Sequence, residues 1–254
     1  MSAGPFDRIV CGVDSSPESL EAVRQSDLLL QPDGKLLLVA AVDVTAAVHF
    51  RIAPTAIHAA RHALEDIEAR DREALQALEQ ARGEATHARE VATLESGGPP
   101  ADCLLDAVTS ERATLAVVGT HGLGRAAGVV LGSVATRVLH RAPCSVLVAR
   151  RRPTGTWSPQ TIVVGVDGSP AANAALLACR ELEARFGSDV RPLKAAGHRP
   201  AHELVEAAAE ADLIAVGNRA THRALGLGSV AERVAHHAGC SVLVVRTREQ
   251  AADA

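Results

Sequence analysis

The sequence predicts an α/β protein built from two related domains in tandem, the second of them shortened. Three observations support this prediction. Short β-branched runs alternate with helical stretches, one segment recurs almost unchanged near the end of each half, and the interval between two matching landmarks is much shorter in the second half. Because strands that alternate with helices form parallel sheets, each half should contain a parallel sheet covered by helices.

Each copy opens with a strand that leads into a helix. Residues 9–13 and 162–166 are β-branched runs, and each is followed by Asp, Ser and Pro. These residue types are typical of a strand end, an N-cap and a first helical turn. Asp14 and Asp167 should therefore lie at the carboxyl ends of the first strands.

The two copies then differ in their middle parts. In the first copy residues 36–42 form a second strand, and the stretch 59–82, rich in Ala, Leu, Glu and Arg, forms a long helix. In the second copy a helix over 171–186 leads directly to an extended stretch at 190–195. The second domain should thus have one strand and one helix fewer.

Spacing agrees with this loss. Asp14 and Pro100 are 86 positions apart, whereas Asp167 and Pro200 are 33 apart, so 53 residues are missing from the second copy. A polar, proline-marked connection near residue 155 is where a domain boundary belongs. The predicted domains are 1–152, which is complete, and 158–248, which is truncated.

The end of each copy carries the strongest internal repeat. Residues 132–148 and 228–244 are identical at 13 of 17 positions without a gap. Each segment reads as a helix, a turn and a short apolar strand, 145–149 or 241–245. These last strands are candidates for pairing the two domains edge to edge within the chain.

Composition excludes several classes of protein. The net charge is −4, Lys occurs only at positions 35 and 194, and aromatic residues are nearly absent, so a nucleic-acid partner is not expected. No apolar run is long enough to cross a membrane. Five cysteines without a CxxC pair indicate a reducing compartment, and we expect a cytoplasmic protein in which Cys144 and Cys240 are small buried apolar residues.

A glycine-rich loop follows the apolar strand 115–118. Gly119, Gly122 and Gly132 leave backbone N–H groups unobstructed, and a helix begins after them, so the loop can hold an anion such as phosphate. The same glycines are also compatible with an ordinary strand-to-helix turn. Ser133 either donates to a phosphate oxygen or caps its own helix, and capping is the commoner role.

Asp14, like Ser133, is compatible with a role in ligand binding and with a role in helix capping. It lies at the carboxyl end of a parallel strand, where open α/β sheets hold ligands, and its carboxylate can accept hydrogen bonds from ribose hydroxyls. Capping of the following helix explains it equally well.

The pattern Gly119-x2-Gly122-x9-Gly132-Ser133 resembles the nucleotide motif of the ATP-binding branch of the universal stress protein family. The opening Val-x-Gly-Val-Asp-x-Ser and the closing Ser-Val-Leu-Val also resemble that family, so the likeness covers nearly the whole chain. It implies Rossmann-like domains, related to the adenine nucleotide alpha hydrolases, with a five-stranded parallel sheet between helices and ATP as a bound ligand.

Carried over residue by residue, the resemblance implies that Asp14 contacts the adenosine part, that Ala41 meets adenine through its backbone and that Gly12 packs under the base. The residues expected around the phosphates are Gly119, His121, Gly122, Arg125, Gly132, Ser133 and Val134. Mg²⁺ is compatible with such a site, because a phosphate-bound metal needs few protein ligands.

The second copy departs from this motif after the strand 213–216. It has Ala220 in place of the second glycine, reaches Gly228 after seven residues instead of nine, and lacks the strand that would bear an equivalent of Ala41. We therefore expect Asp167 and Ser229 to be structural remnants of a site that no longer binds nucleotide.

These observations favour a nucleotide-dependent switch in stress response or signalling, and not an enzyme, because no general base, acidic metal cluster or arginine finger can be assigned. The alternative is a nucleotide-free interaction or scaffold module of the same fold. Adenylation of a substrate is a third hypothesis. In the family the last strand often forms dimers, so a homodimer is the alternative to pairing within the chain.

Overall fold

The structure is a computed structural model that describes residues 6–42, 56–120, 131–152, 155–195, 199–218 and 227–247, with the backbone alone for 56–64. The first copy runs β1 (Arg8–Val13), α1 (Pro17–Leu29), β2 (Lys35–Val42), α3 (Ala56–Glu84), β3 (Glu90–Gly97), α4 (Pro100–Ser110), β4 (Leu115–Gly119), α5 (Ser133–Arg141) and β5 (Ser145–Ala149). The second runs β6 (Thr161–Gly165), α6 (Pro170–Phe186), β7 (Asp189–Leu193), α7 (Pro200–Ala207), a 3-10 turn (Ala208–Glu210), β8 (Leu213–Gly217), α8 (Ser229–His237) and β9 (Ser241–Val245).

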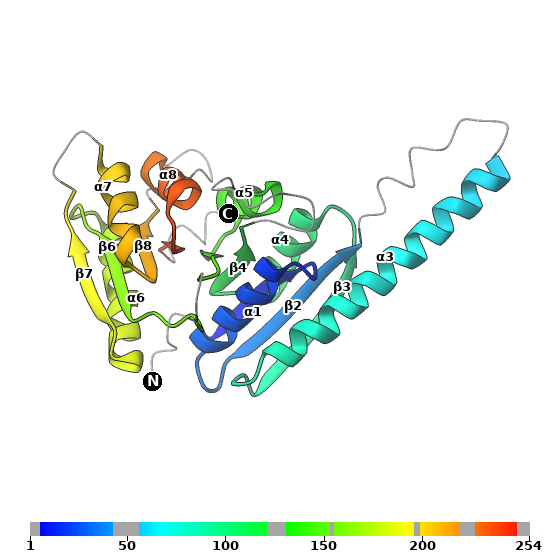
Figure 1. Ribbon diagram of the computed structural model, residues 1–254, viewed down its shortest axis with the longest axis horizontal. Helices are drawn as coiled ribbons and strands as arrows, with labels where there is room; N and C mark the ends of the chain where they lie inside the picture. Colours follow the sequence, from blue (N-terminus) through cyan, green and yellow to red (C-terminus); the bar gives the residue numbers. More distant parts are fainter. Residues whose placement is uncertain are drawn as a thin grey trace.

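The strands form one mixed sheet in the order β3-β2-β1-β4-β5-β9-β8-β6-β7 (Figure 1). Within each copy all neighbouring strands are parallel. The copies meet where β5 pairs antiparallel with β9, with Leu147 opposite Leu243. The prediction that the repeated last strands pair the domains within the chain is confirmed.

The shortening of the second copy is also confirmed. β7 pairs with β6 in the place that β2 takes beside β1, and between β6 and α7 the described chain contains only α6 and β7. β7 lies at the edge of the sheet, which tolerates Pro192 because an edge strand can lack one ladder donor. Since β7 takes the place of β2, the strand and helix without a counterpart among the described residues are β3 and α3, and the expectation that the second copy lacks a strand in the place of the one bearing Ala41 is wrong.

The core has two layers, one on each face of the sheet. Alternate strand residues point to opposite faces, so Ile9 and Cys11 of β1 belong to the layer that includes residues of α1, α3 and α6, whereas Val10 belongs to the layer that includes residues of α4, α5, α7 and α8. Both layers continue across the junction of β5 and β9, so the two copies share one core on each face.

Two serines begin the first helix of each copy. Ser16 Oγ accepts a hydrogen bond from the backbone N–H of Ser19 at 3.1 Å, and Ser169 Oγ accepts from that of Ala172 at 3.2 Å. A proline follows each serine at the first helical position, where it costs no hydrogen bond. The Asp-Ser-Pro pattern therefore fixes where each strand ends and each helix begins.

Two arginines tie the copies together beside the junction of β5 and β9. Arg150, just after β5, donates to the carbonyl of Ala235 in the last turn of α8 at 2.5 Å and to that of Cys240, between α8 and β9, at 3.2 Å. Arg246, just after β9, donates to the carbonyl of Leu139 at 2.8 Å, near the carboxyl end of α5. Each copy thus supplies a cation to the helix terminus of the other, where the helix dipole is negative.

The connection between the copies is held by one tryptophan and one aspartate. Trp157 is buried and its Nε1–H donates to the carbonyl of Asp212 at 3.1 Å. The Asp212 carboxylate accepts from the backbone N–H of Thr161 at 2.8 Å and pairs with Arg152. These contacts anchor the connection on the second copy at the start of β6.

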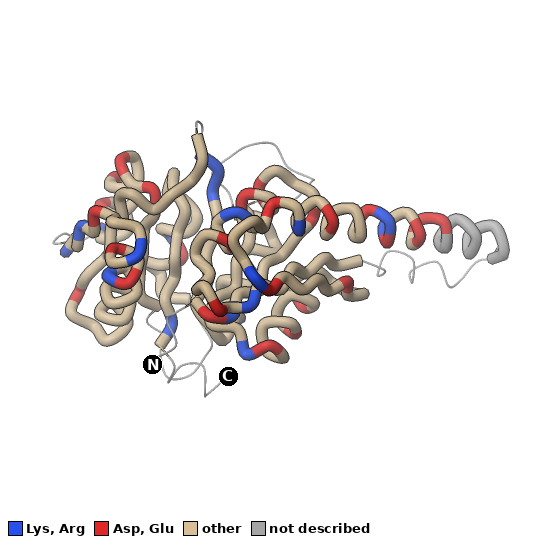
Figure 2. Tube along the Cα trace, turned by 90° about the horizontal axis from the view of Figure 1, so that it is seen from below, with Lys and Arg blue, Asp and Glu red and all other residues tan. Residues whose placement is uncertain are grey.

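The helix α3 is longer than the sequence predicts, 56–84 in place of 59–82. Its carboxyl-terminal half packs on the sheet, and its amino-terminal half projects beyond β2 and β3 (Figure 1). Acidic and basic residues alternate along this helix (Figure 2), as expected for a solvated face.

Among the described residues, no helix has the length and apolarity needed to cross a membrane.

Candidate functional site

The carboxyl ends of β1, β2 and β4 lie at one edge of the sheet because these strands are parallel neighbours. At this edge a cavity of about 280 Å³ is lined by Val13 at the end of β1, by Asp14 and Ser15 after it, by Ala40 and Ala41 of β2, and by one face of α3. Open α/β sheets hold ligands at such edges. Two residues that the sequence assigns to a ligand site, Asp14 and Ala41, are thus brought together.

Asp14 is exposed and also holds the start of α1. Its Oδ1 accepts from the backbone N–H of Ser16 at 3.1 Å and from the Ser16 hydroxyl at 2.5 Å. Within the described residues, every hydrogen bond of the carboxylate uses Oδ1. Asp14 therefore stabilises the start of α1 through Oδ1, and its Oδ2 remains available to a ligand.

Ala41 directs its carbonyl toward the end of β1. The carbonyl of Val42 accepts from Gly98 on the β3 side, and the carbonyls of successive strand residues point to opposite neighbours. The Ala41 carbonyl consequently points to the β1 side, one position beyond the last pair of that ladder, Val13 with Ala40. A carbonyl placed in this way can accept a hydrogen bond from an amino group such as that of adenine.

Sequence reasoning missed the wall that α3 contributes. Arg70, Glu73 and Gln76 line the cavity together with the small residues Ala74 and Ala77. The buried positions of α3, 74, 77, 78 and 81, have helical spacing, and this stripe could have shown which face meets the sheet. It could not have shown that the cavity lies where the helix leaves the sheet.

Ser15 has an unusual backbone conformation beside Asp14. Its φ is +59°, in the left-handed region that non-glycine residues rarely adopt. The second copy has Gly168 at the matching position, with a φ of +79°. The turn after the first strand therefore requires this conformation in both copies, and only the first copy has a side chain there.

Two glycines of the expected site lie where helices pack closely on the sheet, and at Gly119 the backbone of α1 leaves no room for a Cβ. A Cβ on Gly119 would lie 2.8 Å from the backbone carbon of Glu18 in α1, and one on Gly217 in the second copy would clash with the backbone of Ala171 in α6. A Cβ on Gly12 would lie 3.2 Å from Leu104 of α4. These glycines allow helices to approach the sheet closely, so they do not by themselves indicate a ligand.

The middle of the glycine-rich loop, with His121, Gly122 and Arg125, lies outside the described residues. Its two ends are joined, because the backbone N–H of Gly132 donates to the carbonyl of Thr120 at 2.7 Å. The loop therefore leaves and returns at the carboxyl end of β4.

At the start of α5 one prediction is wrong. Gly132 is the N-cap, and Ser133 is the first helical residue, exposed and without a capping hydrogen bond. The commoner role assigned to Ser133, capping of its own helix, is thus excluded by its position. Val134 is half-buried and packs against the core layer under α5.

The second copy keeps the turn but closes the loop differently. Asp167 Oδ1 accepts from the backbone N–H of Ser169 at 2.9 Å, which repeats the contact of Asp14. The buried Asn218 accepts from the backbone N–H of Gly228 through Oδ1 at 3.0 Å, so a side chain bridges the ends of the shorter loop.

The cysteines of the described core are free thiols and not disulfides. All five cysteines are buried, as predicted for Cys144 and Cys240. Burial raises the pKa of the Cys11, Cys144, Cys179 and Cys240 thiols to about 12, so they stay protonated at neutral pH. The residues that the structure describes contain no group of three or more His, Cys, Asp or Glu side chains suited to a metal ion.

Comparison with known proteins gives a consistent picture. The model of the universal stress protein family matches residues 5–150 and 192–246. A universal stress protein of Mycolicibacterium smegmatis is 29% identical over 299 residues, covering 94% of this chain and 97% of its own length. One from Mycobacterium tuberculosis (strain H37Rv) is 29% identical over 298 residues, with 94% and 96% covered.

Solved structures share the fold. A universal stress protein from Archaeoglobus fulgidus superposes with a TM-score of 0.70 at 18% identity, covering 96% of this chain and 99% of that one. A protein described as functionally unknown, from Pseudomonas aeruginosa PAO1, has a TM-score of 0.60 at 16% identity, with 98% and 95% covered. At these identities the likeness extends to the architecture of both copies and no further.

Proposed function

This chain belongs to the universal stress protein family, and from that premise we propose that its first domain binds an adenine nucleotide, with ATP as the ligand. The proposed site is the edge of the sheet where β1, β2 and β4 end. The observation that supports it most directly is the cavity of about 280 Å³ that Asp14 and Ala41 both line.

The contacts that these two residues can make match the adenosine part. Asp14 offers Oδ2 to ribose hydroxyls while Oδ1 remains on Ser16. The Ala41 carbonyl accepts from the amino group of adenine, which distinguishes adenine from guanine. The polar side chains of α3, Arg70 and Gln76, lie on the opposite wall.

The phosphates would extend toward the beginning of α5. The loop that precedes this helix starts after β4, the strand next to β1. The first N–H groups of a helix have no partner within it and favour an anion. Gly132 and the exposed Ser133 lie there, and the same proposal assigns His121, Gly122 and Arg125 to the phosphates.

We further propose that the nucleotide is a regulatory ligand of a cytoplasmic stress or signalling protein and is not turned over. Rapid phosphoryl transfer needs a positioned base and cationic groups around the transferred phosphate. The carboxylate best placed at this site, Asp14, already accepts two hydrogen bonds from Ser16. Mg²⁺ can accompany the phosphates without further protein ligands.

Calorimetric titration of ATP into nucleotide-free protein tests the proposal. We expect one ATP per chain and a loss of at least about tenfold in affinity for Asp14→Asn, since a charge-assisted hydrogen bond contributes about 1.5–3 kcal/mol. Asparagine keeps an oxygen for the N–H of Ser16. ATP incubated with the protein should remain intact over hours.

Asp167→Asn is the matched control, because Asp167 makes the same turn contact with Ser169 in the second copy. It should leave the affinity for ATP unchanged. Absence of binding, or an equal loss in both variants, would reject the first domain as the nucleotide site and favour a nucleotide-free interaction module.

A further inference from the structure

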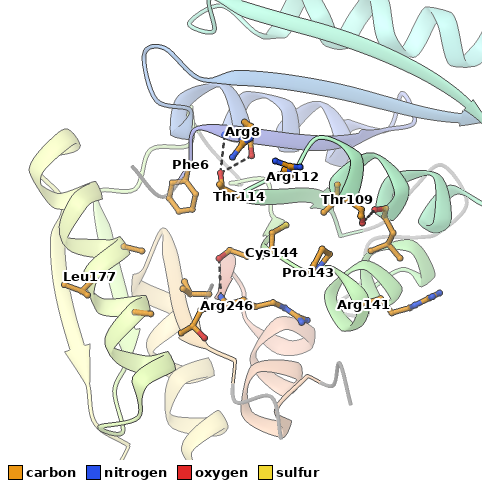
Figure 3. A pocket seen from close by; sticks show the side chains of 18 of the residues that line it. Phe6, Arg8, Thr109, Arg112, Thr114, Arg141, Pro143, Cys144, Leu177 and Arg246 are labelled. Atoms are coloured by element: carbon orange, nitrogen blue, oxygen red, sulfur yellow. Dashed lines mark hydrogen bonds between the residues drawn. The ribbon is translucent and has the colours of Figure 1, made fainter. Parts of the chain in front are cut away.

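A second, larger cavity of about 830 Å³ lies between the two copies. One side is formed by Phe6 and Arg8 at the start of β1, and by the turns that lead into β4 and β5 (Figure 3). The other side is formed by α6 and the end of β9. It lies at the amino ends of β1, β4 and β5, the opposite edge from Asp14 and Ala41, so it is distinct from the proposed nucleotide site.

Arginine dominates the charge of this cavity. Arg8, Arg112, Arg141 and Arg246 line it, against the two carboxylates Asp106 and Glu181. An excess of guanidinium groups around one space favours an anionic guest, because arginine presents planar donors that match phosphate or carboxylate.

The arginines differ in how far they are already paired. Arg141 lies 3.4 Å from Asp102, and Arg8 lies 3.9 Å from Asp7. Arg246 is 8% exposed, its Nη2 donates to the carbonyls of Leu139 and His140 at 2.8 and 3.4 Å, and its Nε is buried, so within the described residues Nη1 is the nitrogen of its guanidinium that remains for a guest. The guanidinium of Arg112 has no hydrogen bond or ion pair to any residue that the structure describes. Donor capacity therefore remains on both sides of the cavity.

Apolar side chains provide the rest of the wall. Leu177 of α6 is 67% exposed, the most exposed large apolar side chain among the described residues, and it lies on the wall opposite Phe6 and Arg8 (Figure 3). Ala174 and Ala178 on the same helix also face the cavity. A guest with an apolar body would cover Leu177 and gain from its removal from water.

Arg112 also has a backbone conformation that costs stability. It follows the end of α4 with a φ of +50°, at a position where helices usually place glycine. The backbone N–H groups of Arg112 and Ala113 donate to the carbonyls of Thr109 and Val108 at 3.1 and 2.9 Å, so this φ belongs to the termination of α4. Replacing Arg112 with glycine therefore removes the charge and keeps the backbone conformation of the turn.

From this geometry we propose that the cavity between the copies binds a small organic anion, with its phosphate or carboxylate on Arg112 and Arg246 and its apolar body on α6. The site needs both domains, because the first supplies Arg112 and the second supplies Arg246 and Leu177. Binding would therefore add contacts between the two domains to those of the β5–β9 junction.

Titration of the full chain with 1-naphthyl phosphate and, separately, 1-naphthoate tests this proposal by the change in probe fluorescence. We expect saturable binding of one probe molecule per chain, weakened at least about tenfold in Arg112→Gly. Arg112→Gly should melt at the same temperature as the parent or higher, so a loss of binding cannot be attributed to unfolding. The uncharged 1-naphthol should bind more weakly than either anion.

Two control variants distinguish this cavity from the nucleotide site and from general attraction of anions to the surface. Arg233→Gln removes an exposed charge of α8 outside the cavity and should leave probe binding unchanged. Asp14→Asn should also leave it unchanged, whatever its effect on ATP. The proposal is overturned if neither anion binds saturably or if Arg112→Gly binds the probe like the parent. It is also overturned if Asp14→Asn abolishes probe binding, because that result would assign the probe to the nucleotide site.

Discussion

At the residue scale, Ser15 and Gly168 show how the two copies diverge at one position. Both have positive φ in the same turn, and only Ser15 has a side chain, beside the cavity of the first copy. A serine in the left-handed region is less stable than a glycine there, because its Cβ approaches the following backbone. The first copy therefore retains a strained residue where the second does not.

We expect Ser15→Gly to raise the free energy of unfolding by about 0.5–1 kcal/mol, since relief of strain exceeds the added flexibility of the unfolded chain. Gly168→Ser should lower it by a similar amount. Urea denaturation followed by circular dichroism measures both. Equal stability of Ser15→Gly and the parent would contradict the assignment of strain to this turn.

The motif predicted some site residues and left others undetected. Asp14 was expected from its place at the end of a parallel strand and Ala41 from the family resemblance, and both line the cavity. Arg70 and Glu73 could not be predicted, because their place at the cavity depends on where α3 crosses the sheet. The packing role of Gly119 also became visible only with the backbone of α1 beside it, so a Gly119→Ala variant would test stability before it tested binding.

At the element scale, the strands and helices were largely predictable because each is marked by its own residues. Apolar runs mark the strands, and Ser-Pro steps mark the starts of α1 and α6. The hydrogen bonds that Arg150 and Arg246 each make with the other copy could not be predicted from the sequence. They depend on the antiparallel pairing of β5 with β9, which brings each arginine to the carboxyl end of a helix in the other copy.

Arg150→Gln should lower the free energy of unfolding by about 1–3 kcal/mol, because the carbonyl of Ala235 in the last turn of α8 and the carbonyl of Cys240 lose a charged donor. Burial lowers the pKa of Arg150 to about 10, so the side chain is still charged at neutral pH. The neighbouring Arg151 is exposed, and Arg151→Gln should change stability by less than about 0.5 kcal/mol. A similar effect in both variants, measured by urea denaturation, would show that general charge and not the helix terminus matters.

At the scale of the whole molecule, the pairing of β5 with β9 leaves no free edge on either of these strands. A strand edge already satisfied within the chain cannot recruit a second chain in the same way. We therefore expect the protein to have the mass of one chain, 26.3 kDa, in size-exclusion chromatography with light scattering. A mass of two chains would mean that another surface, such as the outer edge of β3 or β7, forms a dimer.

The same junction explains why one segment of the sequence repeats so closely. Residues 132–148 and 228–244 are the parts of each copy that meet there, through α5 and β5 on one side and α8 and β9 on the other. The contact is close to isologous, so each copy presents nearly the same surface to the other. A substitution in one segment therefore changes its contact with the matching segment of the other copy, whereas β3, which has no counterpart in the second copy, lies at the far end of the sheet from this junction.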